Sequence, residues 1–111
     1  MGLFEEMEIS ALDVQARLGA SEEIVLVDVV ETWEWEYNRI PGAIHLPMGD
    51  IEARHETALD RSKEIVLYCH MGMRSLQATA WLRGEGYARV KSLAGGINAW
   101  ADDVAPDMPR Y

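Results

Sequence analysis

The stretch EIVLYCHMGMRSLQATAWLRG, residues 64–84, decides the fold. Residues 64–69 form a mostly apolar run of the kind that is buried on both faces of a parallel sheet. A tight loop around Gly72 follows, and residues 75–83 place apolar side chains among good helix formers. Strand, loop and helix therefore follow in that order, and Cys69 lies at the carboxyl end of the strand.

The rest of the chain repeats this alternation of strands and helices. Continuous apolar runs predict strands, and capped amphipathic segments predict helices. We therefore expect an α/β fold, a mostly parallel central sheet of about five strands flanked by helices on both faces. Ligands of such sheets bind beyond the carboxyl ends of the strands. The expected strands are 24–30, 43–46, 64–69 and 90–93, and the expected helices are 10–19, 32–37, 49–59, 75–83 and 97–101.

Length and composition indicate a single domain. The chain has 111 residues, of which 49% are hydrophobic, enough for one core but not for two. Residues 1–111 are expected to form this one domain, with an irregular tail at 102–111 that holds two prolines and acidic residues.

Charge and cysteine content exclude several classes of partner. The formal net charge of -9 disfavours nucleic acid and anionic membranes, and no apolar run approaches the length of a membrane span. The acidic segment 1–10 lacks the pattern of a signal peptide. A lone cysteine cannot form an internal disulfide and suits a reducing compartment. We expect a cytoplasmic protein.

Cys69 is either a small buried hydrophobe or a nucleophile. Free cysteines are often buried for packing alone. Here, however, the cysteine precedes the N-terminus of a helix, Gly72 permits a tight turn of amides, and Arg74 adds a positive charge. These neighbours favour a nucleophile in an anion-binding loop. The expected substrate-binding residues are His70, Met71, Gly72, Met73, Arg74 and Ser75.

At this point the chain resembles the rhodanese-like domains, specifically the single-domain sulfurtransferases. Several ordered motifs carry the resemblance, and together they span nearly the whole chain. The matching segments are VDV with Glu31, Glu34 and Trp35 (27–35), IPGAIHLP (40–47), IVLYC with Gly72, Arg74, Ser75 and Ala78 (65–78), and LAGGI with Ala99 and Trp100 (93–100).

The resemblance implies a persulfide mechanism. Cys69 would take a sulfane sulfur from thiosulfate or a protein persulfide and pass it to cyanide or a thiol. The expected partners are therefore small sulfur-containing anions and thiols, together with a protein that donates or accepts persulfide sulfur. The resemblance implies neither a metal nor an organic cofactor. The three histidines, His45, His55 and His70, also lack ligand spacing, so no metal site is expected.

Two other activities remain as alternatives. Related phosphatases and arsenate reductases place five residues between cysteine and arginine, whereas four separate Cys69 from Arg74 here. The shorter loop resembles that of the sulfurtransferases and disfavours a phosphate-sized substrate. The second alternative is a rhodanese-like module without independent catalysis, which carries or senses sulfur only with a partner.

Two positions depart from the family pattern. The arginine that commonly follows Asp-Val is Val30 here, and the Gly-His before Ile-Pro-Gly-Ala is Asn38-Arg39. The missing arginine puts a supporting charge network near the sheet end in doubt. We hypothesise that Arg39 partly replaces the lost charge beside Asp28, so both residues are expected to support the site.

Overall fold

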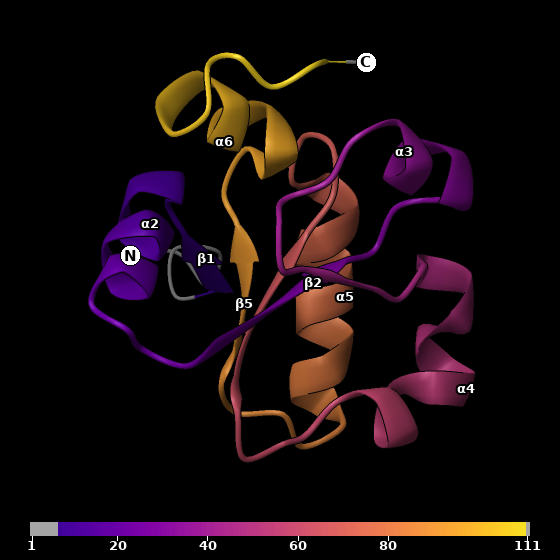
Figure 1. Ribbon diagram of the computed structural model, residues 1–111. Helices are drawn as coiled ribbons and strands as arrows, with labels where there is room; N and C mark the ends of the chain where they lie inside the picture. Colours follow the sequence, from indigo (N-terminus) through magenta and orange to yellow (C-terminus); the bar gives the residue numbers. More distant parts are fainter. Residues whose placement is uncertain (1–6, 111) are drawn as a thin grey trace.

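Five parallel strands form one sheet in the computed structural model, which describes residues 7–110 (Figure 1). The spatial order is β1-β5-β4-β2-β3, and every paired neighbour is parallel. The expected α/β fold with a parallel sheet is therefore confirmed. The ends of the expected 1–111 domain, residues 1–6 and 111, lie outside the described residues. The strands are β1 (Glu8–Ile9), β2 (Ile24–Asp28), β3 (Ile44–His45), β4 (Glu64–Tyr68) and β5 (Val90–Leu93).

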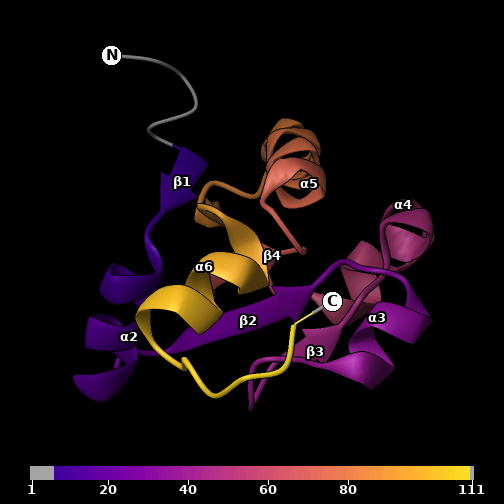
Figure 2. The same ribbon diagram turned by 90° about the horizontal axis from the view of Figure 1, so that it is seen from above.

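Helices cover both faces of the sheet. Figure 2 shows α2 and α6 on one side of the sheet and α4 and α5 on the other. The helix α3 lies beyond the carboxyl end of β2, where Trp35 packs against the same core as α4 and α5. The helices are α2 (Ala11–Gly19), α3 (Thr32–Tyr37), α4 (Met48–Ala58), α5 (Met73–Gly84) and α6 (Gly96–Asp103).

The central strand β4 supplies both hydrophobic cores because its side chains alternate between faces. Ile65, Leu67 and Cys69 belong to the core under α4 and α5. Val66 and Tyr68 belong to the core under α2 and α6. This double burial explains the continuous apolar run in the sequence. It also places Cys69 at the end of a strand that has neighbours on both sides.

Several element boundaries differ from the sequence prediction by one or two residues, and two of these differences have identifiable reasons. The strand β2 ends at Asp28, two residues early, because the Val30 amide donates to the Asp28 carboxylate. The helix α5 begins at Met73 rather than Ser75, because Gly72 adopts a left-handed conformation with φ 101° and starts the helix there. Both differences lie at the carboxyl edge of the sheet.

The segment after α6 is held against the rest of the domain. The helix itself continues through Asp103, two residues into the expected tail. Beyond it, the Tyr37 hydroxyl donates to the Arg110 carbonyl at 2.8 Å, and the Asn38 side-chain amide donates to the Pro109 carbonyl at 2.7 Å. Arg110 also pairs with Asp102 at 2.6 Å. Residues 104–110 are thus irregular but tied to α3 and α6; Tyr111 lies outside the described residues.

Within residues 7–110, the structure has no helix that could span a membrane. It also has no cluster of three or more His, Cys, Asp or Glu side chains placed to hold a metal ion.

Candidate active site

Cys69 directly follows β4 and is 1% exposed. Its Sγ accepts a hydrogen bond from the Gly72 amide at 3.1 Å and from the Ser75 amide at 3.5 Å. Both amides belong to the loop and first turn of α5, where backbone N–H groups have no partner inside the helix. The sulfur therefore lies at the positive end of a 12-residue helix, an arrangement that stabilises negative charge on it.

Gly72 makes this loop possible. Its φ of 101° is a conformation that residues with a side chain rarely adopt. A Cβ at this position would also lie 3.1 Å from the Gly95 nitrogen. The loop therefore packs closely against the start of α6, and this contact requires a glycine.

The N-terminus of α6 fixes the other side of the loop. The Ile97 amide donates to the Cys69 carbonyl at 2.8 Å, and the Asn98 amide donates to the His70 carbonyl at 3.1 Å. Because the N–H of a trans peptide points opposite to its C=O, the amides of His70 and Met71 point away from α6. Gly96 allows this approach, since a Cβ there would lie 2.4 Å from the Cys69 carbonyl oxygen.

Arg74 lies in the first turn of α5 and pairs with Glu34 of α3. Its two terminal nitrogens donate to the two carboxylate oxygens at 2.7 and 2.8 Å. Such a two-point contact holds the guanidinium in one orientation. The Glu34 side chain is only 5% exposed, whereas that of Arg74 is 36% exposed. Glu34 also accepts the Glu31 amide at 3.1 Å and so joins the start of α3 to the loop.

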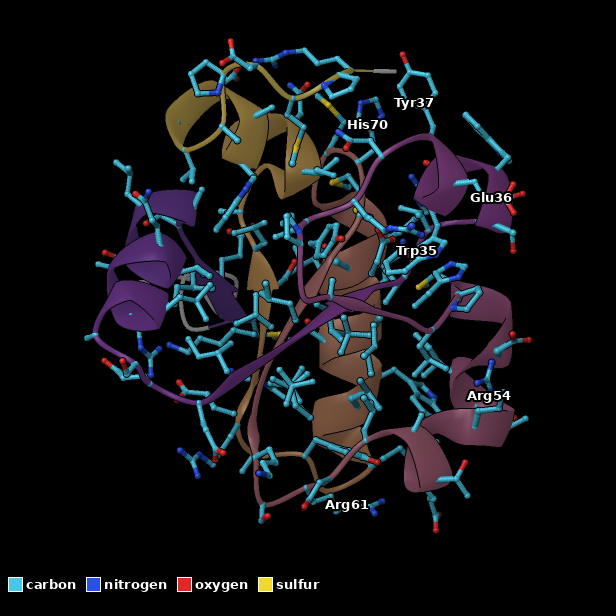
Figure 3. The ribbon with its side chains drawn as sticks, viewed as in Figure 1. Trp35, Glu36, Tyr37, Arg54, Arg61 and His70 are labelled. Carbon is cyan, nitrogen blue, oxygen red and sulfur yellow. The ribbon has the colours of Figure 1, made fainter. Side chains whose placement is uncertain are left out.

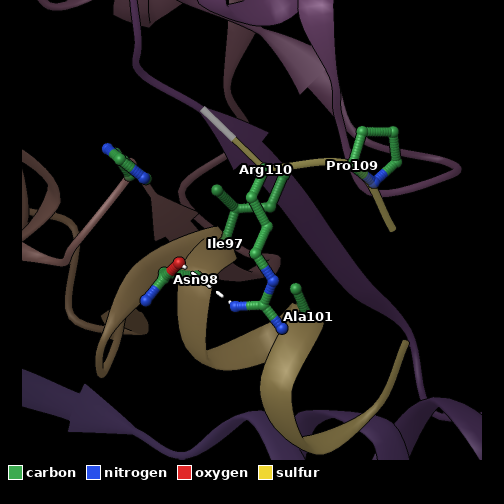
Figure 4. A pocket seen from close by; sticks show the side chains of 6 residues that line it. Ile97, Asn98, Ala101, Pro109 and Arg110 are labelled. Carbon is green, nitrogen blue, oxygen red and sulfur yellow. Dashed lines mark hydrogen bonds between the residues drawn. The ribbon is translucent and has the colours of Figure 1, made fainter. Parts of the chain in front are cut away.

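Three further residues of the loop and the start of α5 were expected to bind substrate. Met71 and Met73 are 59% and 69% exposed, and His70 is half-buried. His70 lines a small hollow against α6 and the C-terminal segment, together with Ile97, Asn98, Ala101, Pro109 and Arg110. In the close view of this hollow, the Arg110 guanidinium reaches the Asn98 side chain (Figure 4).

Ser75 lies beneath the sulfur. Its hydroxyl is 3.5 Å from Cys69 Sγ and 2.8 Å from the hydroxyl of Ser92 on β5. The structure thus brings Ser75 and Gly72 directly to the sulfur, whereas Arg74 is held by Glu34.

Asp28 and Arg39, the two supporting residues expected from sequence, contact different groups. The carboxylate of Asp28, 1% exposed, accepts the Val30 amide at 2.9 Å. Arg39 instead lies over the ring of Trp35 at 4.5 Å (Trp35 is labelled in Figure 3), and Trp35 stacks on His45 at 4.9 Å. Among residues 7–110, no ion pair joins Arg39 to Asp28. Arg39 therefore contacts an aromatic ring and not the carboxylate.

The environment of Asp28 favours its protonated form. Burial raises the pKa of this carboxyl above its ordinary value, while hydrogen bonds from the Val30 amide and the Tyr68 hydroxyl act in the opposite direction. The side chain of Val30, which stands where relatives commonly have arginine, is 1% exposed in the core. The charges of His45 and Glu34 also act on the carboxyl, the first lowering its pKa and the second raising it.

Sequence reasoning did not assign three residues that contact the site. Glu34 pairs with Arg74, Ser92 contacts Ser75, and Gly96 leaves room for the Cys69 carbonyl. Glu34 and Gly96 lay in the motifs of the resemblance, so a signal existed for both. A lone serine in a four-residue strand carries no such signal.

The fold and the site together define a class of protein: a parallel α/β domain that presents a buried cysteine at the N-terminus of a helix. Residues 10–103 match the Rhodanese-like domain family. The chain belongs to that family.

Named relatives agree with this assignment. The protein YtwF of Bacillus subtilis, provisionally named a sulfurtransferase, is 39% identical over 92% of this chain and 97% of its own length. A sulfurtransferase of Allochromatium vinosum is 40% identical over 89% of this chain and 92% of its own. A solved thiosulfate sulfurtransferase of Pseudomonas aeruginosa superposes with a TM-score of 0.80 at 28% identity, covering 93% of this chain and 20% of that one. These relatives support sulfur transfer as the class of activity.

Proposed function

We propose that this protein is a sulfurtransferase that carries a sulfane sulfur on Cys69. The donor is thiosulfate or a protein persulfide, and the acceptor is cyanide or a thiol. The observation that supports this most strongly is the position of Sγ, which accepts two backbone amides at the N-terminus of α5. This environment stabilises an anionic sulfur, which is the reactive form of a cysteine.

The reaction proceeds in two displacements. In the first, the Cys69 thiolate forms a bond to the outer sulfur of thiosulfate, the S–S bond of thiosulfate breaks, and sulfite leaves with the electron pair. In the second, the acceptor forms a bond to the terminal persulfide sulfur, the bond to Sγ breaks, and the thiolate is restored. Backbone amides that face the sulfur stabilise the charge in each step.

The spacing of the loop supports sulfur over phosphorus as the atom attacked. Four residues separate Cys69 from Arg74. The guanidinium is held in a two-point pair by Glu34, which compensates its charge. A phosphatase needs its arginine to bind two oxygens of the transferred phosphoryl group, and here those two donors are engaged by a carboxylate.

Mass spectrometry tests the proposal. After incubation with thiosulfate and removal of excess donor, the intact chain should gain the mass of one sulfur atom. Addition of cyanide should remove that mass and yield thiocyanate. Cys69→Ala serves as the control and should gain nothing. An unmodified wild type, or equal addition to the variant, would show that Cys69 does not carry the sulfur.

A second candidate is a module that exchanges sulfur only with a protein partner. Two methionines of the loop, Met71 and Met73, are more than half exposed. Apolar side chains at an entrance suit contact with another protein better than capture of a small dianion. The net charge of -9 points the same way, because it repels free thiosulfate. Negligible turnover of thiosulfate, with rapid sulfur uptake from a protein persulfide, would favour this candidate.

We also propose a cytoplasmic location. The chain contains one cysteine, and the proposed chemistry needs that thiol in its reduced state. Fractionation of cells that express a tagged chain would test the compartment, and recovery in an oxidising compartment would contradict it.

A further inference from the structure

Two buried hydroxyl groups lie beneath the catalytic candidate Cys69. Ser75 on α5 and Ser92 on β5 are both 0% exposed, and their Oγ atoms are 2.8 Å apart. Ser75 Oγ is also 3.5 Å from Cys69 Sγ and 3.3 Å from the Gly72 carbonyl oxygen. The three polar groups thus form a row from β5 to the sulfur.

The burial of Ser92 fixes the direction of these hydrogen bonds. Each serine hydroxyl has a single proton to donate. Within residues 7–110, the only hydrogen-bond partner of the Ser92 hydroxyl is that of Ser75. A buried donor without an acceptor is costly, so Ser92 donates to Ser75. The proton of Ser75 is then directed either to the Gly72 carbonyl or to Sγ.

We propose that Ser92 is a positioning residue for Cys69, acting through Ser75. When the sulfur carries negative charge, the Ser75 hydroxyl donates to Sγ, because a hydrogen bond to an ion is stronger than one to a neutral carbonyl. When the sulfur is neutral, the same hydroxyl donates to the Gly72 carbonyl. Ser92 donates to a lone pair of the Ser75 oxygen, so the Ser75 proton is left available for Sγ. This inference rests on the proposed function only in taking the anionic sulfur as the reactive state.

The test measures the thiol itself in the full chain. Ser92→Ala should lower the ultraviolet absorbance of the thiolate at neutral pH and slow alkylation of Cys69 by iodoacetamide by about three- to tenfold, the effect of one lost hydrogen bond between neutral groups. Ser92→Thr keeps the hydroxyl and should react within about twofold of wild type. An unchanged rate in Ser92→Ala would overturn the proposal.

Thr79 provides a matched control. It lies one turn beyond Ser75 on α5, is 0% exposed, and its hydroxyl has no hydrogen-bond partner among the described residues. Thr79→Val also removes a buried hydroxyl, but it should leave alkylation unchanged. If this control slows the reaction as much as Ser92→Ala does, a general effect on packing replaces the positioning role.

A double-mutant cycle separates action through Ser75 from any other route. In a Ser75→Ala background, Ser92→Ala should cause no further loss of thiolate absorbance. Additive losses would contradict the proposal. Should Ser92→Ala not fold, Ser92→Cys carries the same test, because it keeps the size of the side chain but is a weak donor.

The measurements also separate this inference from the proposed function. Neither alkylation nor thiolate absorbance needs a sulfur donor. A wild type that never gains sulfur, together with slowed alkylation in Ser92→Ala, would remove the sulfurtransferase proposal and keep the role of Ser92. Normal sulfur uptake by the wild type, together with unchanged alkylation in Ser92→Ala, would keep the sulfurtransferase proposal and remove the role of Ser92.

Discussion

The neighbouring strands β4 and β2 each end at a buried acidic group, but the surroundings of the two groups differ. Asp28 pairs in register with Tyr68, so the carboxyl and the thiol of Cys69 lie at the same edge of the sheet. The sulfur meets two amides at the start of a long helix. The carboxyl meets one amide, one hydroxyl and the apolar core.

This difference shows that burial alone does not decide the state of an acidic group. Both side chains are 1% exposed. Each group accepts two hydrogen bonds, so what separates them is the rest of the surroundings: the sulfur lies at a helix N-terminus, which favours negative charge, whereas burial raises the pKa of the carboxyl. The same edge of one sheet therefore holds a site suited to negative charge beside a carboxyl whose pKa is raised.

The largest effect should follow from Gly96→Ala, which disturbs the loop that follows β4. The new Cβ would lie 2.4 Å from the Cys69 carbonyl and 2.5 Å from that of His70, at a φ of 62°. We expect a loss of about 3 kcal/mol in stability and of about a hundredfold or more in sulfur transfer, because the loop must move. Thermal unfolding and single-turnover assays measure both.

Gly49→Ala is the control for that substitution. Nothing lies within 4 Å of a Cβ at Gly49, which is in the first turn of α4. This variant should keep wild-type activity and stability. If Gly96→Ala behaves in the same way, the packing of α6 against the loop does not organise the site.

A smaller effect is expected from Arg74→Ala, which removes the ion pair between α5 and α3. Removal of the guanidinium leaves the Glu34 carboxylate, with a side chain only 5% exposed, without its ionic partner. We expect a loss of about 2 kcal/mol in stability and a raised KM for thiosulfate. The double variant Glu34→Gln, Arg74→Ala should recover most of the stability but not the KM. Recovery of neither, or of both, would contradict a separate role in binding.

The smallest effect concerns Asp28 and pH. Its folded pKa is raised above the ordinary value of 3.8, so the folded protein binds this proton more tightly than the unfolded chain. Stability from this group is therefore fully present below about pH 4 and is lost as pH rises through the folded pKa. Asp28→Asn should remove that decline in denaturant unfolding across acidic pH.

Asp60 serves as a control because its pKa is shifted in the opposite direction to that of Asp28. Hydrogen bonds from the Ser62 hydroxyl and amide lower its pKa, so its contribution is present above the unfolded pKa and is lost as pH falls. Asp60→Asn should therefore remove a loss of stability that occurs as pH falls, whereas Asp28→Asn removes a loss that occurs as pH rises. If the stability of Asp28→Asn depends on pH in the same way as that of the wild type, the pKa of the buried carboxyl is not raised.

The sequence predicted the elements that rely on local pattern. The apolar runs at 24–28 and 64–68 became the two central strands, because burial on both faces leaves a continuous signal. The end of β4, Gly72 and the start of a helix were likewise visible as consecutive residues.

Contacts between distant residues could not be predicted in the same way. Glu34 pairs with Arg74 across 40 positions, and whether such charges meet depends on how α3 packs. Arg39 lies over Trp35, so its charge is used in a stacking contact that no spacing rule indicates. Ser92 became relevant only through the sheet order, which places β5 beside β4.

The hydrogen bonds from Ile97 and Asn98 to the loop carbonyls have a consequence for the order of events during synthesis. The ribosome releases β4 and the loop about thirty residues before it releases α6, since chains emerge from their N-terminus. Until α6 arrives, nothing holds the Cys69 and His70 carbonyls, and β1 still waits for β5, its only strand partner in the described chain. The nascent protein thus carries its thiol through about thirty residues of synthesis before the cradle around it is complete.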